Sequence, residues 1–167
     1  GEPLAVGVAF FPRGEATNLP GYQREIDRVL RQEGLSPLGW RRVPVDLEAL
    51  GTRAREASRE IWQVLIGEGM RSAVDFAPSL FRVKATLEAQ FRELYLASFA
   101  PRVVVYKALA TGHQLARFYE DLVNPSLRAR VAIFHRRFST NTFSNWYLAQ
   151  PFRLLGHNGE INSIAAN

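Results

Sequence analysis

Residues 135–162 read HRRFSTNTFSNWYLAQPFRLLGHNGEIN, a polar stretch that follows one apolar run and encloses another. The two runs, at 130–134 and 151–156, are short, apolar and bounded by polar or turn-forming residues, which is typical of strands. If these strands lie side by side, the basic, amide and acidic side chains that follow them come to one edge of a sheet. The stretch therefore predicts a polar binding edge on an otherwise apolar scaffold.

Four residues at this edge have complementary chemistry for a small zwitterion. The Arg137 guanidinium suits a carboxylate, and Glu160 suits an ammonium group. The Asn158 amide and the Gly159 N–H suit a developing oxyanion. Together they predict a site that binds an amino acid and stabilises a tetrahedral intermediate.

Each of these residues also has a purely structural interpretation. Asn158-Gly159 is a common turn dipeptide, because both residues tolerate positive φ. Glu160 could lie in the first turn of a helix, where a carboxylate favours the helix dipole, and Arg137 could be an ordinary surface arginine. His135 and His157 have no third ligand at metal spacing, so we expect no metal site. We expect Trp146 and Tyr147 to supply core or lid packing.

The rest of the chain predicts an α+β fold with a mostly antiparallel sheet, because strands come in pairs with few helices between them. The predicted strands are 4–11, 38–45 (with Pro44 marking an edge or an end), 61–66, 80–84, 93–99, 102–107, 130–134 and 151–156. A tight hairpin is predicted around Ala100-Pro101. The predicted helices are 21–33, ended by Gly34, and one opened by the Thr111 and Gln114 capping box and stopped at Asn124-Pro125. Residues 86–92 could be helical, and 47–60 could be a helix or a connector.

The composition excludes several classes of protein. Of the 167 residues 47% are hydrophobic and none is cysteine, so a disordered chain and a disulfide framework are both excluded. We expect a soluble, cytoplasmic protein, since no apolar run is long enough to span a membrane. The net charge is +5, and the excess lies in residues 84–167. Those arginines are scattered among apolar positions, so we expect no nucleic-acid binding.

The ordered motifs of the chain closely resemble the glutamine amidotransferase domain, class II and N-terminal-nucleophile type, of the glutamate synthase large subunit. The motifs are HRRFSTNTF (135–143), LAQPFR (148–153) and HNGEIN (157–162). The resemblance extends to Tyr106-Lys107, to 118–122, to 39–46 and to the opening residues 5–10. It covers nearly the whole chain and a middle portion of the family's domain.

The resemblance implies a four-layer α/β/β/α sandwich of the N-terminal-nucleophile hydrolase type, which we expect to be incomplete, with residues 1–167 as a single partial domain. It implies hydrolysis of L-glutamine to glutamate and ammonia. Arg137 would bind the α-carboxylate of glutamine, Thr140 would line that pocket, and Glu160 would lie by the amino group. Asn158 and the Gly159 N–H would form the oxyanion hole.

The chain also departs from the family, whose nucleophile is an N-terminal cysteine. This sequence starts at Gly1 and contains no cysteine. We therefore expect a companion segment or subunit that carries the cysteine, together with a glutamate synthase domain that uses the ammonia. Residues 1–167 match no cofactor motif, so FMN and an iron–sulfur cluster would belong to other parts of the parent enzyme. We also expect oligomerisation through an incomplete sheet edge.

Two interpretations remain open on the sequence alone. In the first, the chain is the pocket-bearing part of a working glutaminase. In the second, it is a non-catalytic glutamine- or glutamate-binding or assembly module that descends from the same domain. Only the first requires a partner that carries cysteine, and only in the first does the chain take part in catalysis.

Overall fold

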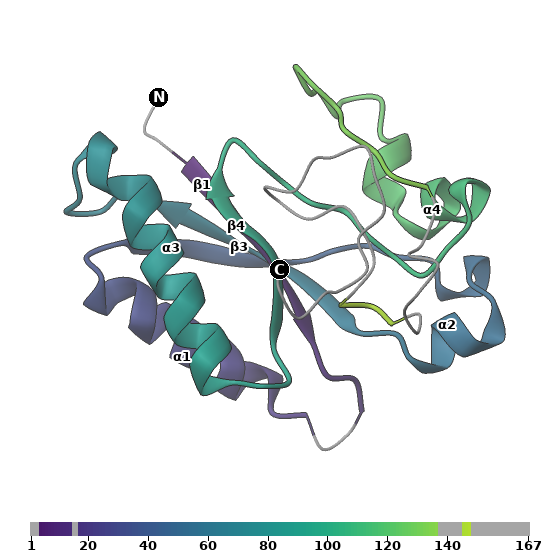
Figure 1. Cartoon of the computed structure of the whole chain (residues 1–167), viewed down its shortest axis with the longest axis horizontal. Coiled ribbons are helices and arrows are strands. Elements are labelled where there is room, and N and C mark those ends of the chain that lie inside the picture. The colour runs from purple at the N-terminus through teal and green to yellow at the C-terminus, as the bar shows by residue number, and fades with distance from the viewer. Residues whose placement is uncertain (1–3, 15–16, 137–144, 148–167) are drawn as a thin grey trace, which may run out of the picture. The chain divides into compact units, whose positions relative to one another are not determined.

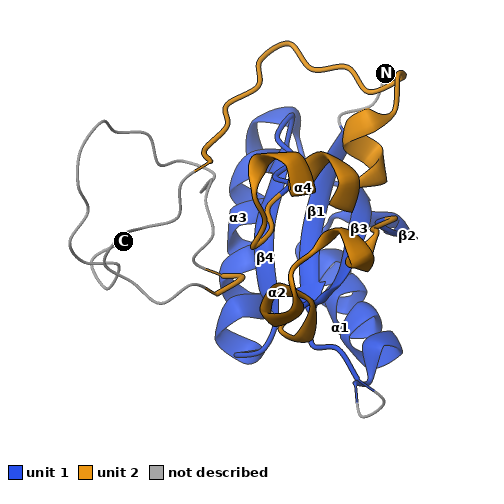
Figure 2. Ribbon diagram, turned by 90° about the vertical axis from the view of Figure 1, so that its right-hand side faces the viewer, with its two compact units in different colours: residues 1–43, 58–106 blue, residues 44–57, 107–167 orange. Residues whose placement is uncertain are grey.

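The computed structural model describes residues 4–14, 17–136 and 145–147 (Figure 1). The chain divides into two compact units (Figure 2). Unit 1 consists of residues 1–43 and 58–106, and unit 2 consists of residues 44–57 and 107–167. The assignment of the whole chain to a single partial domain stays a prediction.

Unit 1 is built on a four-stranded antiparallel sheet with the strand order β2-β3-β1-β4. The strands are β1 (Leu4–Phe11), β2 (Ser36–Arg42), β3 (Glu60–Gly67) and β4 (Tyr95–Pro101). This confirms the predicted combination of helices with an antiparallel sheet. The strand predicted at 4–11 is β1 and is confirmed at both ends. The strand predicted at 61–66 is β3, which extends one residue further at each end. Pro44 lies beyond the end of β2, which is an edge strand.

Two helices, α1 (Leu19–Gln32) and α3 (Ala73–Gln90), lie on the same side of the sheet (Figure 1). The start of α1 is fixed by Asn18, whose side chain accepts a hydrogen bond from the Gly21 N–H at 3.0 Å. Gly34, just past the end, has a φ of 72° that favours glycine. The helix predicted at 21–33 is therefore confirmed, with its start two residues earlier.

The core of unit 1 lies between these helices and the sheet. Side chains at alternate positions of β1 point toward it, while Val8 and Phe10 point to the opposite face and are also buried. A strand buried on both faces is expected to read as a continuous apolar run, as residues 4–11 do. The core residues from the strands are Ala5, Ala9, Phe11, Val64, Ile66, Leu96 and Phe99, and those from the helices are Ile26, Val29, Leu30, Phe76, Leu80, Val83 and Leu87.

The strand predicted at 80–84 is wrong, because these residues lie in the middle of α3. The buried residues Phe76, Leu80, Val83 and Leu87 recur at helical spacing, and a helix buries all four against the sheet. Pro78 lies inside this helix. Because proline usually ends a helix, it makes the helical spacing of the apolar residues hard to recognise in the sequence. The helical alternative for 86–92 holds as far as residue 90.

The hairpin predicted around Ala100-Pro101 is also wrong. Its first arm is β4, but β4 pairs with β1, and residues 102–107 form no strand. Arg102 has a φ of 64°, which turns the chain out of the sheet. The backbone N–H of Val105 then donates to the Ser98 hydroxyl oxygen at 3.1 Å instead of to a strand partner.

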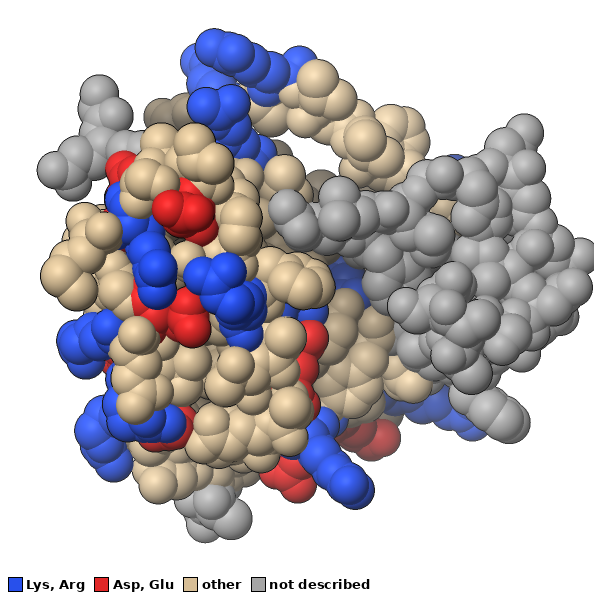
Figure 3. Space-filling view, turned by 60° about the vertical axis from the view of Figure 1, so that its left-hand side comes forward, with Lys and Arg blue, Asp and Glu red and all other residues tan. Residues whose placement is uncertain are grey.

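The surface of unit 1 carries interspersed basic and acidic side chains (Figure 3). Arg28 donates to both carboxylate oxygens of Glu25, through Nε at 2.8 Å, and Gln90 Nε2 donates to Glu25 from α3, also at 2.8 Å. The hydrogen bonds from Arg28 are the main cause, and the one from Gln90 the next, of a pKa of Glu25 that is lowered to about 2. Glu25 therefore links the outer turns of α1 to the end of α3.

Unit 2 contains only short helices among its described residues. They are η1 (Leu47–Ala49, a 3-10 helix), α2 (Thr52–Glu56), α4 (Gly112–Phe118) and η2 (Glu120–Val123, a 3-10 helix). Thr111 and Gln114 form the predicted capping box: the Gln114 N–H donates to Thr111 Oγ1 at 3.4 Å, and the Thr111 N–H donates to Gln114 Oε1 at 2.9 Å. Residues 47–60 are thus two short helices followed by the start of β3.

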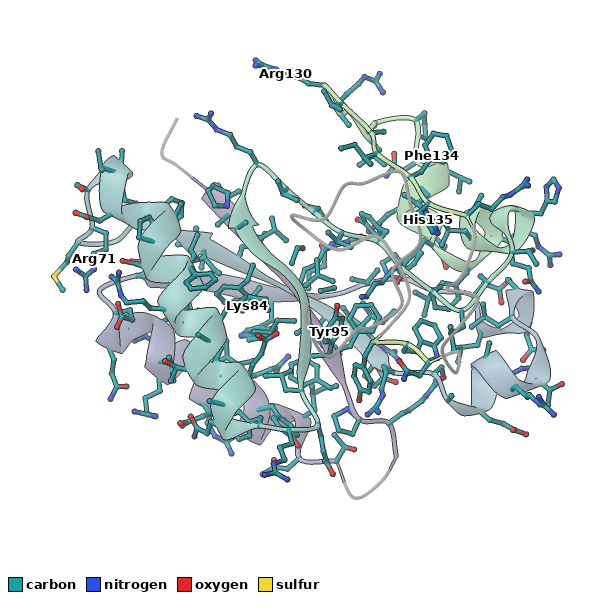
Figure 4. All side chains as sticks on the ribbon, in the orientation of Figure 1. Arg71, Lys84, Tyr95, Arg130, Phe134 and His135 are labelled. Carbon is teal, nitrogen blue, oxygen red and sulfur yellow. The ribbon has the colours of Figure 1, made fainter. Side chains whose placement is uncertain are left out.

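The strand predicted at 130–134 is wrong as well. These residues are extended but form no strand, and Val131, Ile133 and Phe134 are each at least three quarters exposed. Figure 4 shows Arg130 and Phe134 on this segment. A strand needs backbone partners, and the strand predicted at 151–156 as its neighbour lies outside the described residues. The described residues contain one sheet, so the second sheet of the four-layer arrangement stays a prediction.

The close packing of β1 predicts a specific sensitivity at Gly7. A Cβ there would stand 2.5 Å from the Phe99 ring and 2.7 Å from Val64 Cγ1. Gly7→Ala should therefore lower the free energy of unfolding by about 1–3 kcal/mol. Urea unfolding followed by far-UV circular dichroism measures it.

Gly67→Ala is the matched control, because Gly67 is also a strand glycine but its added Cβ would only touch Leu38 at 3.4 Å. This variant should be neutral or slightly more stable. Equal effects of the two substitutions would contradict the close approach at Gly7.

Candidate functional site

Backbone contacts in unit 2 join residues 44–46 to residues 118–120, which are far apart in the sequence. The Asp46 N–H donates to the Phe118 carbonyl at 2.9 Å, and the Glu120 N–H donates to the Pro44 carbonyl at 3.4 Å. Val45 forms an isolated antiparallel bridge with Tyr119. The backbone at the end of α4 is therefore fixed against residues 44–46, which gives the side chains around it a defined support.

Trp146 lies against this support. Its side chain is 2% exposed, its Nε1 donates to the Ala54 carbonyl at 3.3 Å, and its ring centroid is 5.8 Å from that of Phe118. This confirms the packing role that the sequence predicts for Trp146. The short segment 145–147, which we call the bridging segment, is thereby anchored to α2 and α4.

Lys107 is a buried cation next to the bridging segment. Its residue is 1% exposed, and its Nζ donates to the backbone carbonyl of Tyr147 at 3.0 Å. The hydroxyl of Tyr119, which is equally buried, donates to the backbone carbonyl of Lys107 at 2.7 Å. Both ends of Lys107 are therefore held, its backbone by Tyr119 and its ammonium by Tyr147.

An open cavity of about 1000 Å³ lies in unit 2 beside the starts of α2 and α4. It is lined by backbone and side chains of 51–54 and 109–114, and by Arg136. Arg53, His113 and Arg136 bring basic groups to its wall, and none of the three forms an ion pair with a residue that the structure describes. Such a hollow attracts anionic groups, such as a carboxylate.

The five residues predicted from the sequence to form the site all lie outside the described residues. They are Arg137, Thr140, Asn158, Gly159 and Glu160. The bridging segment lies between Arg137 and Asn158 in the sequence, and Arg136 at the cavity wall directly precedes Arg137. The structure thus describes only sequence neighbours of these five residues, and the five roles stay predictions.

The sequence assigned no role to Lys107 or Tyr119. A signal was present, since Lys107 is one of only two lysines among 21 basic residues. The sequence could not show that Lys107 is buried or that its ammonium donates to Tyr147, because both depend on the tertiary structure.

Two other kinds of site find no support in the described part of the chain. No group of three or more His, Asp or Glu side chains there could hold a metal ion. No described helix is both long enough and apolar enough to cross a membrane.

Comparison with known proteins gives one family and a consistent set of relatives. The model of the class-II glutamine amidotransferases matches residues 1–167. Ferredoxin-dependent glutamate synthase 2 of Synechocystis sp. is 38% identical over 174 residues, covering 100% of this chain and 11% of the relative. The glutamate synthase [NADPH] large chain of Azospirillum brasilense is 35% identical, covering 98% and 11%. The chain therefore spans about a tenth of the length of these relatives.

The packing of the bridging segment predicts a measurable cost for losing Trp146. Trp146→Phe keeps an aromatic ring near Phe118 and removes the donor to Ala54, which should lower the free energy of unfolding by about 1 kcal/mol. Trp146→Ala should lower it by about 3–5 kcal/mol. Urea unfolding monitored by circular dichroism gives both values.

Trp62→Phe is the control, because the buried Nε1 of Trp62 has no hydrogen-bond partner among the described residues. Removing an unpaired donor should cost less than removing a paired one. If Trp146→Ala stayed within 1 kcal/mol of the unsubstituted protein, the packing of Trp146 on α4 would be refuted.

Proposed function

The chain belongs to the class-II glutamine amidotransferases, and we propose that it contributes the glutamine pocket and the oxyanion hole to a glutaminase. The reaction is hydrolysis of the side-chain amide of L-glutamine to glutamate and ammonia. The observation that carries this proposal is the match of the family over all 167 residues, which includes every predicted site residue.

Each predicted residue has a physical task in this reaction. Arg137 binds the α-carboxylate of glutamine through a planar two-pronged contact, beside Thr140. Glu160 holds the α-ammonium group. The Asn158 side-chain amide and the Gly159 N–H donate to the oxygen of the scissile amide as it becomes an oxyanion. The basic cavity beside Arg136 supports the proposal, since it draws a carboxylate toward this part of unit 2.

The nucleophile is the part that these 167 residues do not contain. In the family a cysteine thiol attacks the amide carbon while its own α-amino group takes the proton, and ammonia leaves. We propose that a companion segment or subunit supplies that cysteine to this pocket. The ammonia then passes to a synthase domain of a longer parent enzyme, in keeping with the glutamate synthase relatives.

The remaining partners follow from the same assignment. Without cysteine the chain has no thiolate to ligate an iron–sulfur cluster, and we propose that the cluster and FMN bind to other parts of the parent enzyme. We propose a cytoplasmic location and association into oligomers, and we propose no nucleic-acid partner.

A non-catalytic module that binds glutamine or glutamate is the alternative function. Denaturing mass spectrometry of the protein from its native source separates the two. A companion, or an extended form of this chain, that begins with cysteine supports the glutaminase, whereas a lone 18.8 kDa chain would support the binding module.

Arg137→Lys tests the carboxylate contact. In the assembled enzyme it should raise KM for glutamine about tenfold, because lysine lacks the planar fork of arginine. A coupled assay of glutamate release measures KM. Arg130→Lys is the control, because Arg130 is an exposed arginine seven residues earlier in the sequence (Figure 4), and this variant should leave KM unchanged. Unaltered kinetics of Arg137→Lys would remove Arg137 from the site.

Asn158→Ala tests the oxyanion hole. Losing the side-chain donor should lower kcat for glutamine hydrolysis about 10²–10³-fold with a small change in KM. Asn124→Ala, which removes an ordinary turn contact to the Ser126 N–H, serves as the control and should keep full activity. A kcat for Asn158→Ala within twofold of the unsubstituted enzyme would show that Asn158 is a turn residue.

A further inference from the structure

We propose that the open cavity of unit 2 binds a small organic molecule that carries two or more negative groups, either phosphates or carboxylates. The inference goes beyond the proposed function. It rests only on described residues of unit 2, and it requires neither the five residues predicted to bind glutamine nor a cysteine.

The cavity brings together two guanidinium groups and an imidazole from three separate segments of unit 2. Arg53 lies on α2, His113 lies on α4 (Figure 2), and Arg136 follows the extended residues 130–134. The side chains of these three residues form no hydrogen bond or ion pair with a described residue. Because an arginine side chain stays protonated, two unpaired positive charges border one hollow.

The neighbouring Arg55 shows how an arginine of α2 is neutralised within the chain. Its Nη1 donates to both carboxylate oxygens of Glu48, each at 2.8 Å. The described residues that line the cavity include no Asp or Glu, so Arg53 and Arg136 have no such partner among them. An anionic ligand would supply the missing negative charge through charge-assisted hydrogen bonds, which are stronger than neutral ones.

The rest of the wall suits an organic ligand better than a lone inorganic ion. The volume of about 1000 Å³ lies at the upper end of the range for small-molecule sites. Leu109 and Ala110 add apolar surface to the wall, while the hydroxyls of Thr52 and Thr111 can donate hydrogen bonds. A molecule that fills this volume can place one negative group beside each arginine, which a single phosphate ion cannot do.

Gly51 is a position at which the cavity can be altered without strain. It lies on the wall, and a Cβ added there would meet no atom within 4 Å. Its φ of −67° is one that every L-residue adopts readily. A larger side chain at position 51 can therefore be introduced without a clash.

The test is isothermal titration calorimetry of the full protein with inorganic pyrophosphate and, separately, with citrate, at constant ionic strength. We expect at least one of the two probes to bind, one molecule per chain. Arg53→Gln and Arg136→Gln should each weaken that binding about tenfold, because each removes a charge-assisted contact. Arg117→Gln is the matched control, since Arg117 is an exposed arginine of α4 outside the described lining, and its affinity should be unchanged.

A second pair of variants tests the charge of the cavity independently of the arginines. Gly51→Glu adds a carboxylate at the wall and should weaken binding about tenfold relative to Gly51→Gln, which adds a side chain of equal size without charge. Binding of pyrophosphate alone would identify a phosphate-bearing ligand, and binding of citrate alone a polycarboxylate. Either result supports the proposal, and binding of both supports the chemistry that they share.

Three results would overturn the proposal. They are no binding of either probe, an equal loss of affinity in Arg117→Gln, and displacement of the bound probe by L-glutamine, which would make the cavity part of the glutamine pocket. A protein that binds the probe but releases no ammonia from glutamine when the cysteine is supplied would refute the proposed function and leave this inference intact.

Discussion

The pairing of β1 on both of its edges is the constraint on which the rest of unit 1 depends. β1 pairs with β3 from Leu4 to Phe11 and with β4 on the opposite edge, so most of its backbone hydrogen-bonding groups lie within the sheet. Its residues from Gly7 to Phe11 are buried on both faces of the sheet as well. At Gly7 the packing leaves no room even for a Cβ atom, because the side chains of Phe99 and Val64 already fill that space. Helices α1 and α3 pack on the sheet that this central strand holds together.

The elements that could be predicted correctly are those whose determinants lie within their own short stretch of sequence. Residues 4–11 and 19–32 carry their own signals, an apolar run in one and a cap, an amphipathic period and a terminal glycine in the other. The segment 80–84 carries a mixed signal, since a run such as Leu80-Phe-Arg-Val83 suits a strand and a helix equally over so short a window. Only the sheet beneath α3 decides between them, through the four residues that the helix buries. The second arm of the expected hairpin failed for a similar reason: β4 found its partner in β1, far away in the sequence.

The candidate site likewise has features that the sequence predicts and contacts that only the tertiary structure shows. The chemistry assigned to it stays a prediction from the sequence, in which Arg137, Asn158 and Glu160 belong to motifs whose residue types suit a zwitterionic substrate. The contacts of the described part of unit 2 could not be predicted from the sequence, because they join residues from distant positions. Ala54 and Trp146, or Lys107 and Tyr147, have no sequence pattern in common. These contacts depend on the tertiary structure of unit 2, in which the end of α4 pairs with residues 44–46 and Trp146 packs on Phe118.

Lys107 and several described arginines of this chain form different kinds of contact. Described arginines such as Arg28, Arg42 and Arg82 form ion pairs with carboxylates at the surface, where a planar guanidinium can contact both oxygens of a partner. The compact ammonium of Lys107, in contrast, belongs to a buried residue and donates to the backbone carbonyl of Tyr147. Lys107 therefore contributes a contact to the interior of unit 2, whereas these arginines form contacts at the surface.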